Sequence, residues 1–323
     1  MSNHLIFDNW IIQVIMNIEL YLKNLTTPKG EIDVILDTDA YNEIDDQFAI
    51  AYMLANSDRL HVKGICAAPF LNTRSVSPAD GMEKSYNEIL KLLDLAGEEQ
   101  LKDRVYRGSE TYLENEETPV ESEAADYIAN TANAYSPEKP LYIVAIGAIT
   151  NVASAILKNP NMKENVVVVW LGGHGRHIPD AATEFNMKQD IAGARVVMGC
   201  GIPLVQLPCE GVVERFLTTG SELEFWLKGK NKLCDYLVEN TIEEAEKWAK
   251  GRPWSRVIWD VTAVAWLLNS NARFMKDRIC VSPIPEYDGQ YGMKQNGHFI
   301  KYVYQIDRDA LFKDLFERLG GRQ

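Results

Sequence analysis

The sequence predicts an α/β fold, namely a mainly parallel open sheet with helices on both faces. From Ile32 onward, short apolar segments alternate with segments of helical periodicity. These short segments are apolar throughout, which is typical of strands that are covered on both faces. With 323 residues, of which 46% are apolar, the chain is long enough to bury the core of such a fold.

The elements are expected in a regular order along the chain. Short apolar runs predict strands at Ile32–Thr38, His61–Ala68, Leu141–Ala148, Val166–Leu171 and Ile202–Pro208. Apolar residues at helical spacing predict intervening helices at Gln47–Ala55, Gly81–Leu95, Glu121–Ala134, Asn151–Leu157 and Ile191–Met198. A helical segment after Gly220, strand-like runs at Ile279–Pro283 and His298–Ile306, and a last helix from Asp309 complete the pattern. No stretch has the composition of a flexible linker, so residues 31–323 are predicted to form one domain.

The first thirty residues are predicted to be an N-terminal extension that is mainly helical. Asp8 and Glu19 interrupt the apolar segment His4–Leu25, no lysine or arginine precedes it, and no small-residue cleavage site follows it. A secretory signal is therefore not expected, and the apolar core is too short for a membrane span. We expect an amphipathic helix that packs on the body of the protein or on a second subunit.

Charge and cysteine content narrow the class of partner. The formal net charge of −13 argues against nucleic acid and anionic membranes, because both are polyanions. A small neutral or cationic ligand, or a metal ion, is compatible with this charge. The five cysteines are far apart and form no CxxC pair, which favours reduced thiols in a cytoplasmic protein over a disulfide framework.

The segment "VILDTDAYNEIDD", Val34 to Asp46, places four aspartates where a strand gives way to a helix. Asp37 and Asp39 are two residues apart, so they point to the same side if both are extended. Helix capping and surface charge would explain Asp45, but not Asp37, which follows a strand that is expected to be buried. Carboxylates at such spacing repel unless a cation is present, and carboxylate ligands without histidine or cysteine favour Ca²⁺ or Mg²⁺.

Further polar residues follow the other predicted strands. They are Asn72, the pair Thr150–Asn151, and the segment "GGHGRH" at 172–177. Ligands of open α/β sheets bind beyond the carboxyl ends of the strands, where these residues are expected to meet the aspartates. Ca²⁺ takes six to eight oxygen ligands, which is more than the first segment supplies.

Four segments together resemble the inosine–uridine-preferring nucleoside hydrolases. The aspartate cluster is similar to the family's D-x-D-P-G-x-D-D motif, and "GAITN" at 147–151 resembles G-P-L-T-N. The segment "ATEFNMKQD" at 182–190 resembles A-E-F-N-x-x-x-D, and "WDVTAVA" at 259–265 resembles H-D-x-x-A-V-A. The four occur in the family's order between Val34 and Leu268, and they imply a Rossmann-like nucleoside hydrolase fold.

The resemblance implies a bound Ca²⁺ ion. Its ligands would be Asp39, Asp46, the backbone carbonyl of Thr150 and the side chain of Asp260. Asp39 would also be the general base toward a calcium-bound water. The implied enzyme is a ribonucleoside N-ribohydrolase of nucleoside salvage, which forms a homo-oligomer (a dimer or tetramer).

The resemblance also implies which residues bind the sugar. Asp45, Glu184 and Asn186 would hold the ribose hydroxyls, and Asp260 would be shared between metal and sugar. Carboxylates near the sugar stabilise the oxocarbenium-like state through which a glycosidic bond is cleaved.

The loop between Asp39 and Asp45 departs from the family pattern. It reads "AYNEI", two residues longer than usual and without the Pro-Gly turn. The loop must therefore bulge to keep both acids at the metal, and Asn42 or Glu43 becomes a candidate ligand contact.

Two sugar-binding positions differ as well. Ile178, with His177 beside it, stands where the family has a Gly-Asn pair. Leu71 occupies the place of an asparagine after the second strand, and the adjacent Asn72 is the candidate replacement after a shift of one residue.

Trp259 occupies the position of a histidine that protonates the leaving base in many family members. Tryptophan does not transfer its indole proton, so base stacking by Trp254, Trp259 or Tyr287 is one alternative. The other candidate proton donors are His174, His177 and His298.

Two alternatives to a hydrolase remain at this point. A DxD phosphatase would use Asp37 as nucleophile and Asp39 as acid, but no clear Ser/Thr and Lys at later strand ends would bind the phosphate. The missing histidine also allows a non-catalytic nucleoside- or ribose-binding protein that keeps the metal site.

Overall fold

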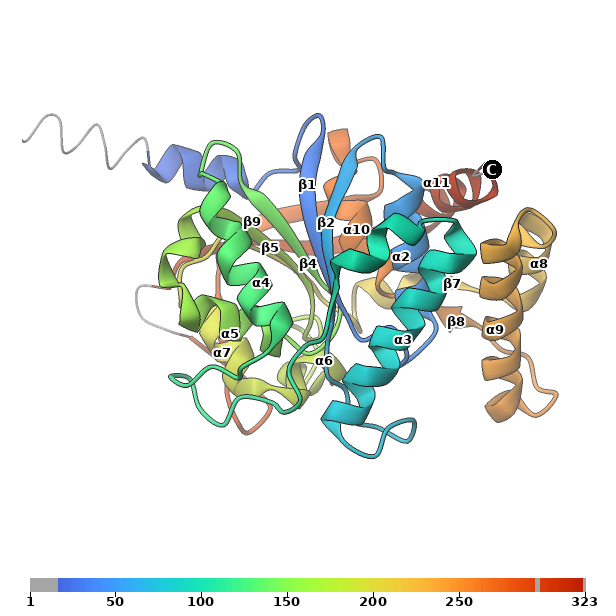
Figure 1. The fold of residues 1–323 in the computed structure, drawn as a ribbon, viewed down its shortest axis with the longest axis horizontal. Helices are drawn as coiled ribbons and strands as arrows, with labels where there is room; N and C mark the ends of the chain where they lie inside the picture. Colours follow the sequence, from blue (N-terminus) through green and yellow to red (C-terminus); the bar gives the residue numbers. More distant parts are fainter. Residues whose placement is uncertain (1–16, 294–296, 322–323) are drawn as a thin grey trace, which may run out of the picture.

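An eight-stranded sheet runs through the middle of the protein (Figure 1). The computed structural model describes residues 17–293 and 297–321. The strand order is β3-β2-β1-β4-β5-β6-β12-β9, and all neighbours are parallel except β12 and β9. The strands are β1 (Ile32–Thr38), β2 (Leu60–Ala67), β3 (Val105–Tyr106), β4 (Leu141–Ala145), β5 (Val166–Leu171), β6 (Leu204–Leu207), β9 (Met275–Val281) and β12 (Phe299–Ile306). The predicted mainly parallel sheet is confirmed.

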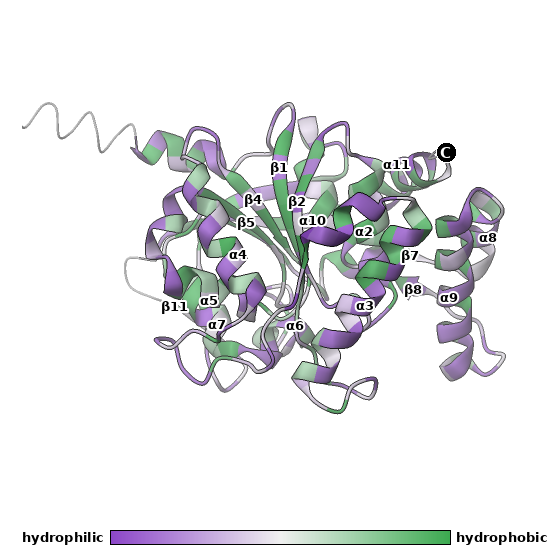
Figure 2. Cartoon of the chain, in the orientation of Figure 1, coloured by the Kyte–Doolittle hydropathy of each residue, from purple (hydrophilic) through white to green (hydrophobic). Residues whose placement is uncertain are grey.

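Helices cover both faces of this sheet (Figures 1 and 2). The cluster on one face includes residues of α2 (Asp45–Ala55), α3 (Pro78–Ala96), α9 (Lys232–Ala249), α10 (Val261–Leu267) and α11 (Arg308–Gly320). The cluster on the other face includes residues of α4 (Glu123–Thr131), α5 (Thr150–Lys158), α6 (Phe185–Gln189) and α7 (Ile191–Gly199). Successive residues of β1 alternate between the two, since Val34 and Leu36 join the first cluster and Ile35 joins the second.

Two small sheets and one further helix complete the fold, and this helix contributes Leu223 and Leu227 to the first cluster. They are the pair β7 (Leu217–Thr218) and β8 (Arg256–Val257), the pair β10 (Pro283–Pro285) and β11 (Tyr291–Met293), and helix α8 (Gly220–Leu227). The sequence did not predict these short strands or β3, because two or three residues carry no detectable periodicity. The predicted strand Ile279–Pro283 is wrong in extent, since β9 begins at Met275 and Pro283 belongs to β10.

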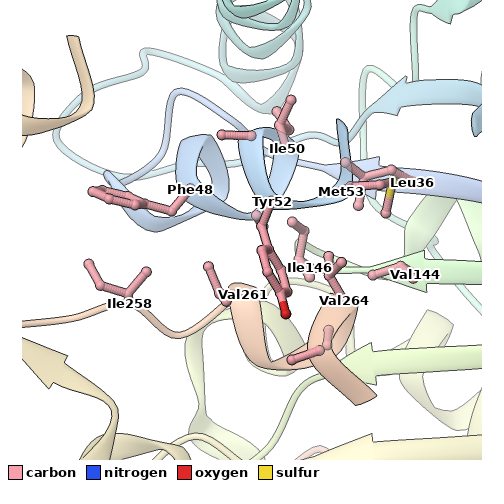
Figure 3. Close-up of a cluster of buried hydrophobic side chains, with 14 of the residues drawn as sticks. Leu36, Phe48, Ile50, Tyr52, Met53, Val144, Ile146, Ile258, Val261 and Val264 are labelled. Carbon is pink, nitrogen blue, oxygen red and sulfur yellow. The ribbon is translucent and has the colours of Figure 1, made fainter. Parts of the chain in front are cut away.

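Helix α2 packs against α10, and this contact positions the candidate site. Figure 3 shows the Tyr52 side chain of α2 pointing toward α10, with Val261 on one side and Val264 and Ile146 on the other. Burial of each such apolar side chain contributes about 1.5–3 kcal/mol to stability. Because both helices begin at the carboxyl edge of the sheet, their packing brings the aspartates at their N-terminal ends together.

The described part of the N-terminal extension contains a helix at residues 17–24. The Tyr21 hydroxyl donates a 2.7 Å hydrogen bond to the Phe299 carbonyl, and the Asn24 amide donates one of 2.9 Å to the Pro137 carbonyl. These bonds tie the helix to the body of the same chain. The first half of the predicted helix His4–Leu25 lies outside the described residues. In the part that the structure describes, no helix is both long and apolar enough to cross a membrane.

Candidate active site

A pocket opens among the loops that follow the strands. It is lined by residues from six separate parts of the chain: Asp39, Asn42, Glu43, Asp45, Asp46, Ile146, Leu171, His174, Glu184, Phe185, Asn186, Cys209, Glu210, Trp259 and Asp260. Seven of these side chains carry a carboxyl group. The carboxyl edge of the sheet is therefore the candidate site, as the topology rule predicts.

The loop between β1 and α2 delivers the first three aspartates. Asp39 directly follows β1, and its carbonyl accepts a 2.7 Å hydrogen bond from the Asn42 amide, which turns the inserted loop. Asp45 and Asp46 form the first turn of α2, where the helix dipole favours negative charge. All three side chains are buried, at 1–3% exposure.

Three carboxylates converge on one point. Oxygen atoms of Asp45, Asp46 and Asp260 all lie within 4.8 Å of one another, although Asp260 is more than 200 residues away along the chain. Both carboxylate oxygens of Asp39 are buried beside them without a hydrogen-bond partner in the described structure. Gly147 allows this approach, because a Cβ atom there would lie 3.1 Å from the Asp39 Cγ.

Burial and mutual repulsion raise the pKa of the carboxyl groups in this cluster. Burial raises the pKa of Asp39 well above its usual value, and the charges of Asp46 and Asp45 raise it further. Burial, followed by the charge of Asp45, does the same to the pKa of Asp260. Burial raises the pKa of Asp46 to about 6, although a hydrogen bond from Thr38 opposes the shift. Four buried carboxyl groups, of which Asp39 has both oxygens without a hydrogen-bond partner in the described structure, fit a divalent cation with oxygen ligands.

Thr150 and Asp37 lie behind the pocket and do not line it. The Thr150 hydroxyl donates a 2.6 Å hydrogen bond to Asp190, which also accepts from the Gly193 amide and thereby caps α7. Asp37 accepts a 2.7 Å bond from Asn151. Asp37 therefore belongs to an internal network, and its placement gives no support to a phosphatase nucleophile.

Glu184 and Asn186 line the pocket on the side of α6. The Glu184 carboxylate accepts hydrogen bonds of 2.9 Å from the Gly173, Asn186 and Met187 amides, and so caps α6. The side-chain amide of Asn186 donates hydrogen bonds of 3.2 Å to the Ile146 carbonyl and 3.1 Å to the Leu171 carbonyl. These bonds fix both side chains before any ligand arrives.

The side predicted to hold the base contains Trp259 and His174. Trp254 and Tyr287, the other two candidate stacking residues, do not line the pocket. The His174 Nδ1 accepts a 3.3 Å hydrogen bond from the Glu210 amide. His177 is exposed, and neither it nor His298 lines the pocket.

Asn72 does not line the pocket, but it contacts a residue that does. Its amide donates a 2.6 Å hydrogen bond to the side-chain oxygen of Asn42, which does line the pocket. The inserted loop therefore occupies the space between Asn72 and the ligand position. Asn42 was one of the two candidate contacts from the inserted loop, but the sequence did not indicate that it would lie between Asn72 and the pocket.

Glu43, one of the two candidates from the inserted loop, lines the pocket, whereas Cys209, Glu210 and Phe185 were not predicted. Glu43 forms a 2.8 Å ion pair with Arg256, which precedes Asp260 by four residues. Cys209 and Glu210 follow β6, and attention to that strand end would have found them. Phe185 carried no separate signal, because an aromatic residue beside a motif is more often part of the core.

A family model described as inosine-uridine preferring nucleoside hydrolase matches residues 34–313. The chain belongs to this family. The predicted recognition, fold class and enzyme class, an N-glycosyl hydrolase, are confirmed at the level of the family. Family and fold support ribonucleoside hydrolysis, and the aspartate cluster of this nucleoside hydrolase could bind a metal ion.

The individual relatives share only a modest fraction of their residues with this chain. A pyrimidine-specific ribonucleoside hydrolase of Enterobacter sp. is 27% identical over 202 residues, which cover 57% of this chain and 62% of that protein. The match thus spans less than two thirds of that relative. A plant nucleoside hydrolase structure superposes with a TM-score of 0.72 at 21% identity, covering 90% of this chain and 99% of that one. A purine-preferring ribonucleoside hydrolase from Gardnerella vaginalis gives 0.70 at 20% identity, with 90% and 98% covered.

Proposed function

We propose that this protein is a calcium-dependent hydrolase that cleaves the N-glycosidic bond of a ribonucleoside to give ribose and a free base. The observation that carries the proposal is the convergence of Asp45, Asp46 and Asp260 beside the unpartnered carboxylate of Asp39. Membership of the nucleoside hydrolase family supports the reaction class. The names of relatives point to pyrimidines in one case and purines in another, so they favour no single base.

The residues of the pocket fit a Ca²⁺ ion. Asp39, Asp46 and Asp260 would supply carboxylate oxygens. The family resemblance adds the backbone carbonyl of Thr150, a residue behind the pocket lining, as the proposed fourth protein ligand. A bound Ca²⁺ would keep the clustered carboxylates ionised and would lower the pKa of a water molecule in the pocket. The all-oxygen ligand set favours Ca²⁺ or Mg²⁺ over Zn²⁺, and we propose Ca²⁺ from the family resemblance.

The other proposed roles are proton transfer and ribose binding. Asp39, with no internal hydrogen bond to satisfy it, is positioned to accept a proton from the attacking water. Asp45, Glu184 and Asn186 would bind the ribose hydroxyls and hold the sugar in one orientation. The nearby carboxylates would stabilise positive charge on the sugar as the glycosidic bond breaks.

Assignments that depend on cellular context belong to the same proposal. They are a role in nucleoside salvage, a cytoplasmic location, and a homo-oligomeric assembly, all of which follow from the family resemblance and the composition. The alternative is a binding protein for nucleosides or ribose, and the position of Trp259 in place of a histidine is the observation that favours it.

The deciding experiment measures release of reducing sugar from a panel of ribonucleosides in the presence of Ca²⁺. We expect turnover by the natural protein and a loss of about 10²–10⁴-fold in Asp39→Asn, because the general base is removed. Asp309→Asn, at an exposed position 87% accessible, is the matched control. Thermal stabilisation by nucleosides without sugar release would favour the binding protein, and full activity of Asp39→Asn would reject Asp39 as the base.

A further inference from the structure

The inserted loop brings a buried side-chain amide to the pocket. Asn42 lines the pocket and is only 8% exposed. Its backbone amide donates a 2.7 Å hydrogen bond to the Asp39 carbonyl, and its own carbonyl accepts one of 3.4 Å from the Arg74 guanidinium. That guanidinium also lies over the Tyr41 ring, 4.6 Å from its centroid. The turn that carries Asn42 is therefore held in place by the body of the protein before any ligand binds.

A chain of hydrogen bonds fixes which end of the Asn42 amide faces the pocket. The backbone N–H of Arg74 donates a 2.8 Å hydrogen bond to the Asn72 Oδ1. A backbone N–H only donates, so the bonded atom is the amide oxygen, and the Asn72 nitrogen is the end that donates onward. Its acceptor is the Asn42 Oδ1, at 2.6 Å. Asn42 therefore has its oxygen turned toward Asn72 and its Nδ2 left to meet a ligand.

This orientation makes Asn42 a partner for an organic ligand rather than for the metal ion. Side-chain amide oxygens bind Ca²⁺, but the Asn42 oxygen is already an acceptor for Asn72. An amide N–H group donates hydrogen bonds and does not bind cations. Among the described residues, no group accepts a hydrogen bond from the Asn42 Nδ2, so the pocket holds an unused donor next to Asp39.

The proposed ribose contacts on the α6 side offer acceptors. Asn186 uses both of its amide hydrogens on the Ile146 and Leu171 carbonyls, which leaves its oxygen for a ligand. The Glu184 carboxylate is an acceptor as well, and it already accepts from three backbone amides. A sugar hydroxyl donates one hydrogen bond and also accepts. These two residues satisfy the first requirement, and the Asn42 amide is placed to satisfy the second.

We propose that Asn42 is a substrate-binding residue whose amide donates a hydrogen bond to one ribose hydroxyl, and that this contact contributes to sugar specificity. The inference rests on the proposed hydrolysis of ribonucleosides. Asn42 belongs to the loop that is two residues longer than the family pattern, so the family motif does not supply this contact. Asn72 is a positioning residue, because it orients the Asn42 amide and does not line the pocket.

The test pairs variants with substrates that lack single hydroxyl groups. Sugar release is measured from inosine and uridine and from their 2′-, 3′- and 5′-deoxy forms. We expect Asn42→Ala to lower kcat/KM about 3–10-fold on the complete ribonucleosides, mainly through KM, because one neutral hydrogen bond is lost in both the bound and the transition state. On one of the three deoxy forms the same variant should lose nothing further, since the hydroxyl that Asn42 contacts is already absent.

A second variant tests the orienting role of Asn72 while leaving Asn42 in place. Asn72→Ala should lower kcat/KM by about 2–3-fold, less than the loss of the contact itself, and with the same dependence on one hydroxyl. Added to Asn42→Ala, it should have no further effect, because the amide that it orients is gone. Asn87→Ala, at an exposed position on α3, is the matched control and should change neither KM nor kcat.

Calcium affinity and kcat separate a lost contact from a disturbed loop. A general disturbance of the loop that carries Asp39 would lower kcat on every nucleoside alike and weaken Ca²⁺ binding. The proposed contact predicts a Ca²⁺ dissociation constant within about 2-fold of the natural value in Asn42→Ala, because Asn42 is not a ligand. A melting temperature measured beside each variant shows that the variant is folded.

The possible outcomes are distinct. Equal losses of Asn42→Ala on all of the deoxy forms, or unchanged activity on the complete ribonucleosides, would overturn the contact and leave the proposed hydrolase intact. Absence of sugar release by the natural protein from every nucleoside in the set would overturn the proposed function. Calorimetric binding of the same nucleosides would then decide the contact by the same comparison. A loss that disappears with one missing hydroxyl, at unchanged Ca²⁺ affinity, would support the inference.

Discussion

The hydroxyl group of Thr38, the last residue of β1, donates a 2.5 Å hydrogen bond to the Asp46 carboxylate in the first turn of α2. Both side chains are buried. The bond connects the end of the sheet to the start of the helix and directs one Asp46 oxygen, so the metal-facing geometry depends on a residue that is not itself a ligand.

Removal of this hydroxyl should weaken calcium binding. In Thr38→Val we expect the dissociation constant for Ca²⁺ to rise by about 10-fold, because residues that orient a ligand typically contribute 10–100-fold. Thr38→Ser keeps the hydroxyl and is the matched control, expected to stay near the natural affinity. Calorimetric titration measures both, and equal affinities of the valine and serine variants would contradict the role of this bond.

Asn151 should be important for stability rather than for chemistry. Its side chain joins three segments, since it donates to Asp37 and to the Ala67 carbonyl at 2.7 and 3.1 Å and accepts from Ser109. In Asn151→Ala we expect the free energy of unfolding to fall by about 2–3 kcal/mol, because buried partners lose their hydrogen bonds. Urea denaturation measures this loss. The exposed Asn87→Ala in α3 is the control, and a similar change in both variants would contradict the prediction.

Gly147 should be required for the position of Asp39. A Cβ atom at 147 would lie 3.1 Å from both the Asp39 Cγ and the Ala68 Cβ, which is closer than side chains normally pack. Gly147→Ala should therefore reduce sugar release by about 10-fold or more, since small misplacements of a catalytic group are costly. Gly199→Ala is the control, because a Cβ there would make only an ordinary 3.6 Å contact. Unchanged activity of Gly147→Ala would show that Asp39 has room to move.

Metal removal should destabilise the protein in a pH-dependent way. In the metal-free protein, burial raises the pKa of Asp46 to about 6 and that of Asp39 and Asp260 well above the usual value of 3.8. The folded state then binds more protons than the unfolded chain, so stability falls as the pH rises from about 4 through 6. Ca²⁺ should raise the melting temperature strongly near pH 8 and weakly near pH 5. An effect of Ca²⁺ that is equal at both pH values would contradict this electrostatic account.

Much of the sheet was predictable, because buried parallel strands are continuous apolar runs. The predicted bounds of β1 and β5 agree with the structure, and Asp39, Asp45, Asp46 and Asp260 were all recognised from motifs. The ion pair of Glu43 with a residue more than 200 positions away was not predictable, because tertiary packing of α2 against α10 creates it. Short strands such as β7 and β8 also depend on tertiary contacts rather than on local periodicity.

The inserted loop shows why motif matching alone was insufficient for the remaining site residues. Asn72 was the expected sugar contact, yet Asn42 from the longer loop accepts its hydrogen bond and lines the pocket instead. His177 was adjacent in sequence to a family sugar-binding position, but its side chain is exposed. Both differences arise from loop conformation, which sequence spacing does not specify.

The central claim is that carboxylates from distant parts of the chain bind one Ca²⁺ ion. Calcium titration of chelator-treated protein, followed by calorimetry, tests it most directly. We expect about one high-affinity ion per chain in the natural protein. Asp260→Asn should lose that site, because it removes one of the carboxylates that lie together in the cluster. Absence of calcium binding, or binding that is unchanged in Asp260→Asn, would contradict the account.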